Sequence, residues 1–460
     1  MSDARRQLRR IETALRLHDR GKVNWAYAHY LKILERDPFV LQILCNTAGI
    51  EIERGAYAKA EARYRLALEY YPESPVAVSG LCLCLHHRHA PQEARAVSAA
   101  LLERAPDDPQ AYYTHAMTLS RDGDTQTALR VVDEGLRHCA PHQKRNKPRT
   151  DLLKARGLLR IAEGDYAGGF RDRAYFALFG HAEATATYPL DLAAFQGKTV
   201  LIHPEEGNGD GVALGRFIQP FAESGARLSV ACRPAMRRMM ESLSDIADLV
   251  PEPKTYDGYD HVLPPIALPH ILGTKPGTLP APMTLAIPAD SLARGAAFAA
   301  PYADRLKVGF CWSGSTGYAD NAHRSARLDP FLKLAQTAGT QFFSLYKGPL
   351  LTDLFSHAQR DRVIDTSSDD RDYADAAGTI AAMDLVITTD TCVAHIAGSL
   401  GTETWLLLHR APYYYYPRHQ EDRTIWYPSM RLFRQDKAGD WDTVFAAVQA
   451  ALTERSAKHG

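Results

Sequence analysis

The sequence has no long run of apolar residues. Nowhere do about 18 apolar residues follow one another, which is the length a membrane-spanning helix needs. Arg5, Arg6, Arg9 and Arg10 interrupt the start of the chain, so the apolar core of a secretory signal is missing there. We therefore expect no membrane-spanning segment and a cytoplasmic location.

Runs of like charge and closely spaced cysteines are also scarce. Lysine plus arginine and aspartate plus glutamate both number 54, and no long polybasic run argues for nucleic acid as a partner. The seven cysteines show no C-x-x-C spacing, which suits a reducing compartment better than a disulfide framework. Cys82 and Cys84 form one C-x-C pair, which we interpret as helix packing and not as a metal site.

The first third of the chain repeats with a period of 34 residues. Gly21, Gly55 and Gly123 keep this interval, and His89 stands where the pattern has a further glycine. Four alanines keep it as well: Ala26, Ala60, Ala94 and Ala128. This period resembles the tetratricopeptide repeat, a helix-turn-helix unit in which glycine ends the first helix and alanine lets the two helices approach closely. A fifth unit follows at Gly164, after seven extra residues.

The repeat predicts an all-α solenoid over residues 1–180, made of four to five tetratricopeptide units. The insertion before the fifth unit falls near the basic loop 142–149. Stacked repeats expose a long groove, so the functional interpretation is a surface that binds a protein partner. A passive spacer or a dimerisation arm is the alternative, and the oligomeric state stays open.

The second half of the chain has a different pattern, which begins at Gly197 after a linker over residues 181–196. Apolar strands alternate there with helices, which predicts parallel α/β sheets whose ligands bind at the carboxyl ends of the strands. A proline-rich crossing at 264–288 divides the region into two lobes, at 197–304 and 305–460. The strands that we expect lie at 198–203, 226–232, 307–312, 341–346, 362–365, 385–388 and 404–408.

Three motifs lie at the ends of these strands. Residues 206–210 (EGNGD) form a glycine-rich turn, and residues 308–314 (VGFCWSG) precede an Arg-Ser pair at 324–325. Residues 390–401 read D-T-x-x-A-H-x-A-G-x-L-G. On these motifs the two lobes resemble GT-B glycosyltransferases of the heptosyltransferase-like type, which bacteria often fuse behind tetratricopeptide repeats. The resemblance covers 197–452 and implies a GT-B fold of two Rossmann-like lobes, an acceptor-side lobe followed by a nucleotide-sugar-binding lobe.

The third motif carries the electrostatic part of the chemistry. Thr391 and the backbone N–H groups of Cys392 and Val393 open a helix, and such a helix start binds phosphate oxygens. His395 lies one turn further along and supplies another hydrogen bond or, alternatively, packs as a buried helix residue. Asp390 orients the turn through backbone hydrogen bonds or contacts the substrate.

Other side chains complete the candidate donor site. Arg324 offers a fork of donors to a diphosphate, with Ser325 beside it, and Lys347 is a second cation similar to the family's pattern. These cations can neutralise a departing phosphate, so we expect neither a metal ion nor a cofactor. Trp312 either stacks on a base or sugar or packs in the core. The tyrosines at 413–416 form either a wall of the cleft or an oligomer contact.

Asp210 is the candidate general base of the acceptor-side lobe. A carboxylate on a glycine turn can approach an incoming hydroxyl and remove its proton, and the resemblance implies a catalytic aspartate at this position. The alternative is that Asp210 only caps the helix that begins near Gly211. Glu205 and Glu206 are further candidates.

Together these features predict a metal-independent, inverting glycosyltransferase that takes sugar from an activated nucleotide donor. The expected acceptor is a protein docked on the repeats, and the resemblance implies flagellin or another surface protein. Two alternatives stay open: a non-catalytic tetratricopeptide scaffold with a degenerate GT-B domain, and a transferase directed at lipopolysaccharide or another glycan. The scaffold is less favoured because the candidate base, both cations and the histidine are all present.

Overall fold

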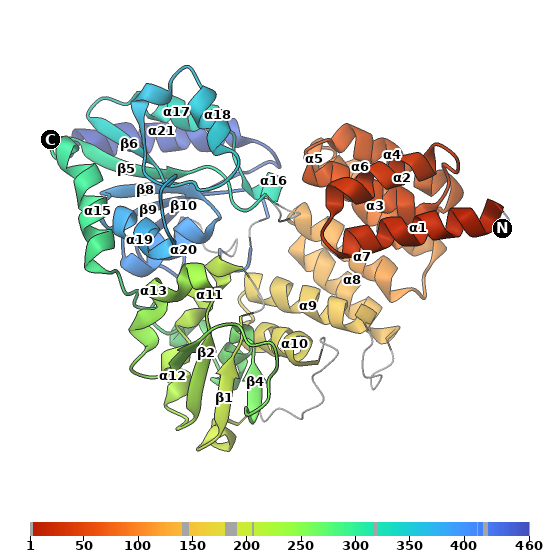
Figure 1. The fold of residues 1–460 in the computed structure, drawn as a ribbon, viewed down its shortest axis with the longest axis horizontal. Coiled ribbons are helices and arrows are strands. Elements are labelled where there is room, and N and C mark those ends of the chain that lie inside the picture. The colour runs from red at the N-terminus through yellow and green to blue at the C-terminus, as the bar shows by residue number, and fades with distance from the viewer. Residues whose placement is uncertain are drawn as a thin grey trace. The chain divides into compact units, whose positions relative to one another are not determined.

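The structure is a computed structural model, and it describes residues 3–139, 147–179, 191–204, 207–316, 318, 321–411, 413–416 and 422–459. The chain divides into two compact units, residues 1–141 and residues 142–460 (Figure 1). The first unit is helical, and the second contains two parallel β-sheets with their helices. The predicted fold class, a helical repeat followed by two parallel α/β lobes, is therefore confirmed.

The helices described in the first unit form four helix-turn-helix repeats. The turn inside each repeat needs a left-handed residue, and Gly21, Gly55, Gly123 and His89 have φ of 71°, 71°, 79° and 58°. The periodic alanines are 0% exposed, because a methyl group leaves room for the paired helices to touch. The helices are α1 (Asp3–Asp19), α2 (Val23–Leu34), α3 (Leu41–Glu53), α4 (Tyr57–Tyr70), α5 (Pro75–His87), α6 (Pro91–Arg104), α7 (Pro109–Arg121) and α8 (Thr125–Arg137).

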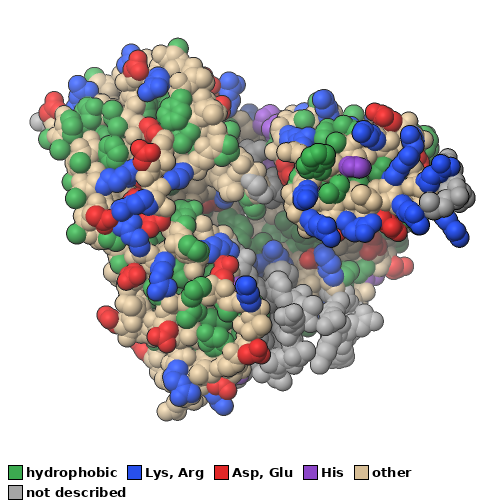
Figure 2. Space-filling model, in the orientation of Figure 1, with side chains coloured by type: hydrophobic (Ala, Val, Ile, Leu, Met, Phe, Trp, Pro, Cys, Tyr) green, Lys and Arg blue, Asp and Glu red, His purple; other side chains and the backbone are tan. Residues whose placement is uncertain are grey.

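Local sequence signals explain where several of these helices start. Ser74 and Asp108 accept a hydrogen bond from a backbone N–H in the first turns of α5 and α7, and proline follows each as the first helical residue. Figure 2 shows lysine and arginine side chains gathered on the visible face of this unit. In α1 the exposed cations are Arg5, Arg6, Arg9, Arg10 and Arg16. This helix therefore presents a basic face to solvent.

A fifth helical hairpin belongs to the second unit. Its helices are α9 (Lys147–Ala162) and α10 (Tyr166–Phe179). Gly164 joins them with a φ of 90°, as in the other repeats. Tyr166 and Phe170 are nevertheless buried in the same core as Trp426 of the α/β region. The compact units thus divide near residue 141, whereas the sequence predicts the end of the repeats at 180. The predicted boundaries stay a proposal, since residues 140–146 and 180–190 lie outside the described part of the chain.

The N-terminal lobe of the second unit contains a parallel four-stranded sheet in the order β3-β2-β1-β4. Its strands are β1 (Thr199–Ile202), β2 (Arg227–Ala231), β3 (Asp248–Val250) and β4 (His261–Leu263). Because β2 and β4 lie on opposite sides of β1, the carboxyl end of β1 is the switch point at which open sheets bind ligands. Helix α11 (Asn208–Gly215) begins there and carries Asp210. Further helices of this lobe are α12 (Ile218–Ala222), α13 (Arg237–Met240) and α14 (Leu268–Ile271).

The C-terminal lobe contains a parallel six-stranded sheet in the order β10-β9-β8-β5-β6-β7. Its strands are β5 (Leu306–Cys311), β6 (Thr340–Ser344), β7 (Val363–Asp365), β8 (Leu385–Thr389), β9 (Thr404–Leu408) and β10 (Met430–Arg434). Every residue of β6, β8 and β9 is buried, as expected for parallel strands that helices cover on both faces. The chain leaves β5 on one side and returns on the other, so the switch point lies between β5 and β8.

Helices cover the six-stranded sheet and connect its strands (Figure 1). They are α15 (Ala289–Ala299), α16 (Asn321–Arg324), α17 (Leu328–Leu334), α18 (Leu351–Ser356), α19 (Tyr373–Ala381), α20 (Cys392–Leu400) and α21 (Trp441–Ala457). Ion pairs connect this lobe with the N-terminal lobe. Arg238 of α13 lies 3.2 Å from Asp372 and 2.9 Å from Asp290. The lobes are therefore joined at the edge formed by α13, α15 and α19.

Candidate functional site

The start of α20, directly after β8, is the candidate anion site. Thr391 precedes the helix in an extended conformation, with φ of −141°. Its hydroxyl is buried and lies 3.2 Å from the hydroxyl of Thr388. The first amides of a helix have no partner within it, so Cys392 and Val393 contribute N–H groups at the switch point of the sheet. The Thr391 hydroxyl is engaged inside the protein, which leaves these amides as the donors.

Arg324 is the cation of this site. Its guanidinium is half-buried, stacks on Tyr318 at 4.6 Å and donates from Nε to Asn321 Oδ1 at 3.3 Å. Asn321 also donates to the hydroxyl of Ser313 at 3.0 Å, so it holds the loop after β5 together. A Cβ on Gly314 would lie 2.5 Å from Arg324 Nη2, which explains the glycine of this motif. Among the described residues, no carboxylate lies within ion-pair distance of Arg324.

Asp390 is a buried carboxyl group, 6% exposed, beside this cation. Burial raises the pKa of Asp390 to about 6, and the charge of Arg324 opposes part of that rise. The side chain makes no hydrogen bond with any residue that the structure describes, so orientation of the turn through backbone hydrogen bonds finds no support. Asp390 remains a carboxyl group beside Arg324 whose pKa is raised above its usual value.

His395 is buried within α20 and has one polar contact. Its Nδ1 lies 3.0 Å from the hydroxyl of Tyr427. Burial, together with the nearby charges of Arg216 and Arg324, lowers the pKa of His395 to about 3, so the imidazole is neutral at physiological pH. The Tyr427 hydroxyl fixes the orientation of the imidazole ring.

Arg216 is a buried cation that the sequence analysis does not single out. Its guanidinium donates to the backbone oxygens of Ala213, Pro280 and Trp426 at 3.0, 3.2 and 2.8 Å. It also stacks over the rings of Trp426 and Tyr427, at 4.9 and 5.0 Å from their centroids. In the sequence, Arg216 is distinguished only as a single charged residue among the apolar residues that follow Gly211. Arg216 belongs to the N-terminal lobe. Its contacts with Trp426 and Tyr427 connect this lobe to the tyrosine that contacts His395.

Asp210 contacts groups from both lobes. Its Oδ2 accepts the backbone N–H of Gly207 at 3.2 Å, so the carboxylate does cap α11. Its Oδ1 accepts a hydrogen bond from the hydroxyl of Tyr415 at 2.7 Å. Asp210 therefore caps α11 and also lies at the switch point of β1. Glu205 and Glu206 lie outside the described residues.

Gly209 explains how the two halves of the site meet. A Cβ on this residue would lie 2.9 Å from His395 Cδ2 and 3.4 Å from the Cα of Cys392. Only glycine permits this distance, because a side chain would separate the starts of α11 and α20. The glycine-rich turn thus brings Asp210 next to the helix start of the other lobe.

Three other predicted donor-site residues have different surroundings. Trp312 is 2% exposed and packs between Phe310 and Tyr346, which matches the core alternative. The Lys347 ammonium donates to the carbonyl oxygen of Asp370, and β5 separates its strand from β8. Ser325 lies beside Arg324, with its hydroxyl 2.9 Å from that of Ser313. The structure therefore gathers Asp210, Arg324 and the segment 390–395, whereas Trp312 and Lys347 have other partners.

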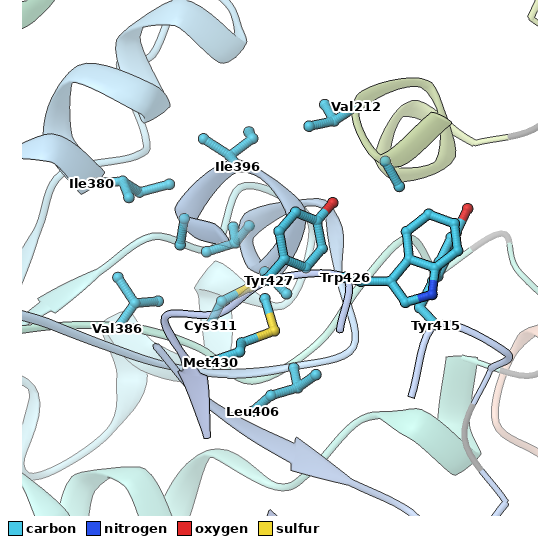
Figure 3. Close-up of a cluster of buried hydrophobic side chains, with 14 of the residues drawn as sticks. Val212, Cys311, Ile380, Val386, Ile396, Leu406, Tyr415, Trp426, Tyr427 and Met430 are labelled. Atoms are coloured by element: carbon cyan, nitrogen blue, oxygen red, sulfur yellow. The ribbon is translucent and has the colours of Figure 1, made fainter. Parts of the chain in front are cut away.

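The tyrosines at 413–416 are mostly buried. Tyr414, Tyr415 and Tyr416 are 2%, 1% and 0% exposed, so these three form neither an open cleft wall nor an oligomer contact. Figure 3 shows Tyr415 next to Trp426 and Tyr427 within the core, below Val212 of α11. The sequence indicates their amphipathic character, but it does not reveal that they pack between α10, α11 and α20.

The described residues contain no group of three or more histidine, cysteine, aspartate or glutamate side chains placed to hold a metal ion. None of their helices combines the length and the apolar character needed to cross a bilayer.

Comparisons with known proteins give the following likenesses. A tetratricopeptide repeat family model matches residues 51–117. Protein FlbA of Caulobacter vibrioides is 26% identical over 161 residues, which are 33% of this chain and 26% of FlbA. The chain thus spans about a quarter of that relative's length.

Solved structures with similar folds include one for each part of the chain. The ADP-heptose LPS heptosyltransferase II of E. coli is 12% identical, with 56% of this chain and 99% of that chain covered and a TM-score of 0.40. YrrB, a TPR protein with an unusual peptide-binding site, is 17% identical, with coverages of 36% and 84% and a TM-score of 0.26. The predicted repeats agree with the family model over residues 51–117, and the two predicted parallel α/β lobes are present in the structure.

Proposed function

We propose that this protein is a glycosyltransferase that moves a sugar from an activated nucleotide donor to an acceptor hydroxyl. The observation that carries the proposal is the position of Arg324. It is a half-buried cation without a carboxylate partner among the described residues, at the switch point of the six-stranded sheet and beside the start of α20. A guanidinium and free helix amides together suit a phosphate group.

The proposed reaction uses groups from both lobes. Asp210 takes the proton of the acceptor hydroxyl while the acceptor oxygen forms a bond to the anomeric carbon of the sugar. The bond from that carbon to the phosphate oxygen breaks, and its electron pair leaves with the nucleotide. Arg324, the α20 amides and the His395 imidazole stabilise the charge that develops. Attack from the acceptor lobe inverts the anomeric centre, and protein cations take the place of a metal ion.

The proposed acceptor is a protein docked on the repeats. The first unit supports this role because it has its own core, built from three of the periodic alanines with aliphatic side chains, cysteines and two tyrosines around them. Flagellin or another surface protein is the acceptor that the family resemblance suggests. The proposed location is the cytoplasm, which suits seven cysteines outside any disulfide, six of them buried.

A thermal-shift panel tests nucleotide binding. UDP, GDP, ADP and CMP are each added to the protein, and we expect one of them to raise Tm, because a ligand at 100 times its Kd adds about 2.7 kcal/mol of stability. Arg324→Ala should weaken that nucleotide by about 1.5 to 3 kcal/mol, the value of hydrogen bonds to a charged group. Arg327→Ala is the matched control, since its exposed side chain pairs with Asp329 at the surface.

Turnover of a nucleotide sugar tests the second half of the proposal. Asp210→Asn should abolish transfer and donor hydrolysis while the nucleotide still raises Tm, because the substitution removes the base and keeps the cations. If no nucleotide changes Tm and Arg324→Ala behaves like Arg327→Ala, the transferase proposal fails and the non-catalytic scaffold is favoured. Turnover on glycan acceptors alone would instead favour a transferase directed at lipopolysaccharide or another glycan.

A further inference from the structure

The Asp210 carboxylate is held by a hydroxyl that comes from the opposite lobe. Tyr415 lies in the segment after β9 and is 1% exposed. Its hydroxyl is 2.7 Å from Asp210 Oδ1, while Oδ2 accepts the N–H of Gly207 at 3.2 Å. An ionised carboxylate can only accept hydrogen bonds, so the Tyr415 hydroxyl is the donor. Both oxygens of the candidate base are therefore fixed in direction.

A second tyrosine extends this contact. The Tyr414 hydroxyl donates to the Tyr415 oxygen at 3.0 Å, so two hydroxyl groups lead to the carboxylate in one chain. Each bond in such a chain polarises the next and strengthens it. The Tyr415 ring packs against Trp426 at 4.6 Å and against His395 at 4.9 Å between ring centroids. Packing on two sides leaves the Tyr415 ring a single orientation.

We propose that Tyr415 is a positioning residue that orients and stabilises the ionised Asp210 carboxylate, with Tyr414 supporting it from behind. The inference rests on the proposed function, because it assigns Tyr415 to the base of that reaction. A catalytic group has to be held within about 0.5 Å of its productive position, which a buried ring and two donors achieve. The bond crosses between the lobes, so the base reaches this geometry only while the lobes are together.

Several other groups face the turn that carries Asp210. Burial raises the pKa of the Cys392 thiol to about 12 and lowers that of His395 to about 3, so both are neutral near pH 7. Asp390 is a further carboxyl that titrates in the acidic range. Neutral or charged groups from the remaining elements are Tyr416, Tyr373 and Arg233. All of these groups are retained in Tyr415→Phe, so its difference from the wild type reports the Tyr415 hydroxyl.

The test compares Tyr415→Phe with Tyr416→Phe in the full-length protein. The probe is the nucleotide sugar of the panel that the wild type hydrolyses fastest. Tyr415→Phe should lower kcat by about 10-fold to 100-fold with KM nearly unchanged, because it removes one hydrogen bond to a charged group. It should also move the acidic limb of the pH profile upward by about one pH unit, since the carboxylate loses a stabilising donor. Tyr416→Phe should match the wild type, since the Tyr416 hydroxyl has no partner among the described residues.

An unchanged pH profile in Tyr415→Phe, or the same loss in Tyr416→Phe, would overturn the inference and leave only packing. A second measurement is independent of activity. Tm values of Asp210→Asn, Tyr415→Phe and the double variant should be non-additive by several degrees, because the two groups share one bond. Additive values would also overturn the inference. A wild type that neither binds nor hydrolyses nucleotide sugars would instead refute the proposed function, while the Tm comparison still decides whether the bond exists.

Discussion

Two buried carboxyl groups of the C-terminal lobe show how environment decides the effect of a charge. Burial raises the pKa of Asp390 to about 6, so its ionised form destabilises the folded state. Asp375 is 0% exposed, but hydrogen bonds from Arg371 at 2.7 and 2.8 Å hold its pKa well below the usual range. The ionised form of Asp375 therefore stabilises the fold. An ionised aspartate thus destabilises the fold at one buried position and stabilises it at another.

This contrast predicts opposite pH dependences for two conservative variants. The cost of ionising Asp390 is absent below about pH 4, grows between about pH 4 and 6 and stays constant above that, so Asp390→Asn should gain stability over the wild type between pH 5 and 8, by at most about 3 kcal/mol. Asp375→Asn should lose about 3 to 5 kcal/mol at every pH in that range, because a buried ion pair is broken. Denaturant unfolding at several pH values measures both. A gap between Asp390→Asn and the wild type that shrinks as the pH rises would contradict the assignment.

Individual site residues differ in how far the sequence predicts them. Arg324 and the segment 390–395 lie in recognisable motifs at strand ends, and the parallel sheet brings those ends together. Tyr415 is 205 positions from Asp210, and no local pattern connects the two. Arg216 lies over the ring of Tyr427, the partner of His395, and this contact likewise arises only from the packing of the lobes. Contacts between lobes depend on tertiary structure, which periodicity does not encode.

Among the elements, the turns of the repeats follow most directly from sequence. The residue between the two helices of each repeat has a positive φ, and three of the first four are glycine. His89 adopts a φ of 58° in the third repeat, a conformation that costs an L-residue about 1 kcal/mol. The 34-residue period therefore identifies a position where the chain is locally strained.

His89→Gly should stabilise the first unit by about 0.5 to 1 kcal/mol, because glycine adopts this turn without steric cost. Gly55→Ala is the matched control. Its Cβ would meet nothing within 4 Å, so its expected loss of about 1 kcal/mol arises from the φ of 71° alone. Thermal unfolding of both variants beside the wild type measures the two effects. A loss of stability in His89→Gly, of the same sign as that in Gly55→Ala, would show that contacts of the His89 side chain outweigh the backbone term.

Strands were predictable where they are long and apolar. The buried strands β5, β6, β8 and β9 coincide with apolar runs that the sequence analysis identifies. The sequence does not predict β3, β4 and β10. Strands β3 and β4 have three residues each, and β10 carries Arg431 and Arg434, so none of them has a distinct apolar run. Their positions follow from pairing with longer neighbours in the sheet.

On the scale of the whole molecule, the fifth hairpin shows how local pattern and packing can differ. Its glycine turn and helix lengths match a repeat, which is why the sequence assigns it to the solenoid. Tyr166 instead accepts a hydrogen bond from Trp426 Nε1 at 2.9 Å, and Phe170 packs edge-on against Phe217 and Tyr414. The hairpin thereby supports the same tyrosine segment that contacts Asp210. We infer that it is a structural part of the α/β unit.

Two truncations separate the hairpin from the repeats before it. A chain that starts at Lys147 keeps the core of the second unit, so it should unfold cooperatively, bind the nucleotide of the panel and hydrolyse the donor, but not modify a protein acceptor. A chain that starts at Asp191 exposes Phe217 and Trp426, and we expect it to aggregate or to lose about 5 kcal/mol or more, since each buried aromatic ring contributes about 2 to 3 kcal/mol.

Two point variants of the full-length protein also test whether the hairpin supports the α/β unit. Phe170→Ala should cost about 3 to 5 kcal/mol and weaken nucleotide binding, because a buried ring at the base of the tyrosine segment is lost. Tyr175→Ala on the same helix is the control, since its ring is 38% exposed and its loss should cost far less. Chemical denaturation and the thermal-shift panel read out both. If the chain that starts at Asp191 is as stable as the longer one, and Phe170→Ala leaves nucleotide binding intact, the hairpin is a passive repeat and the transferase unit begins after it.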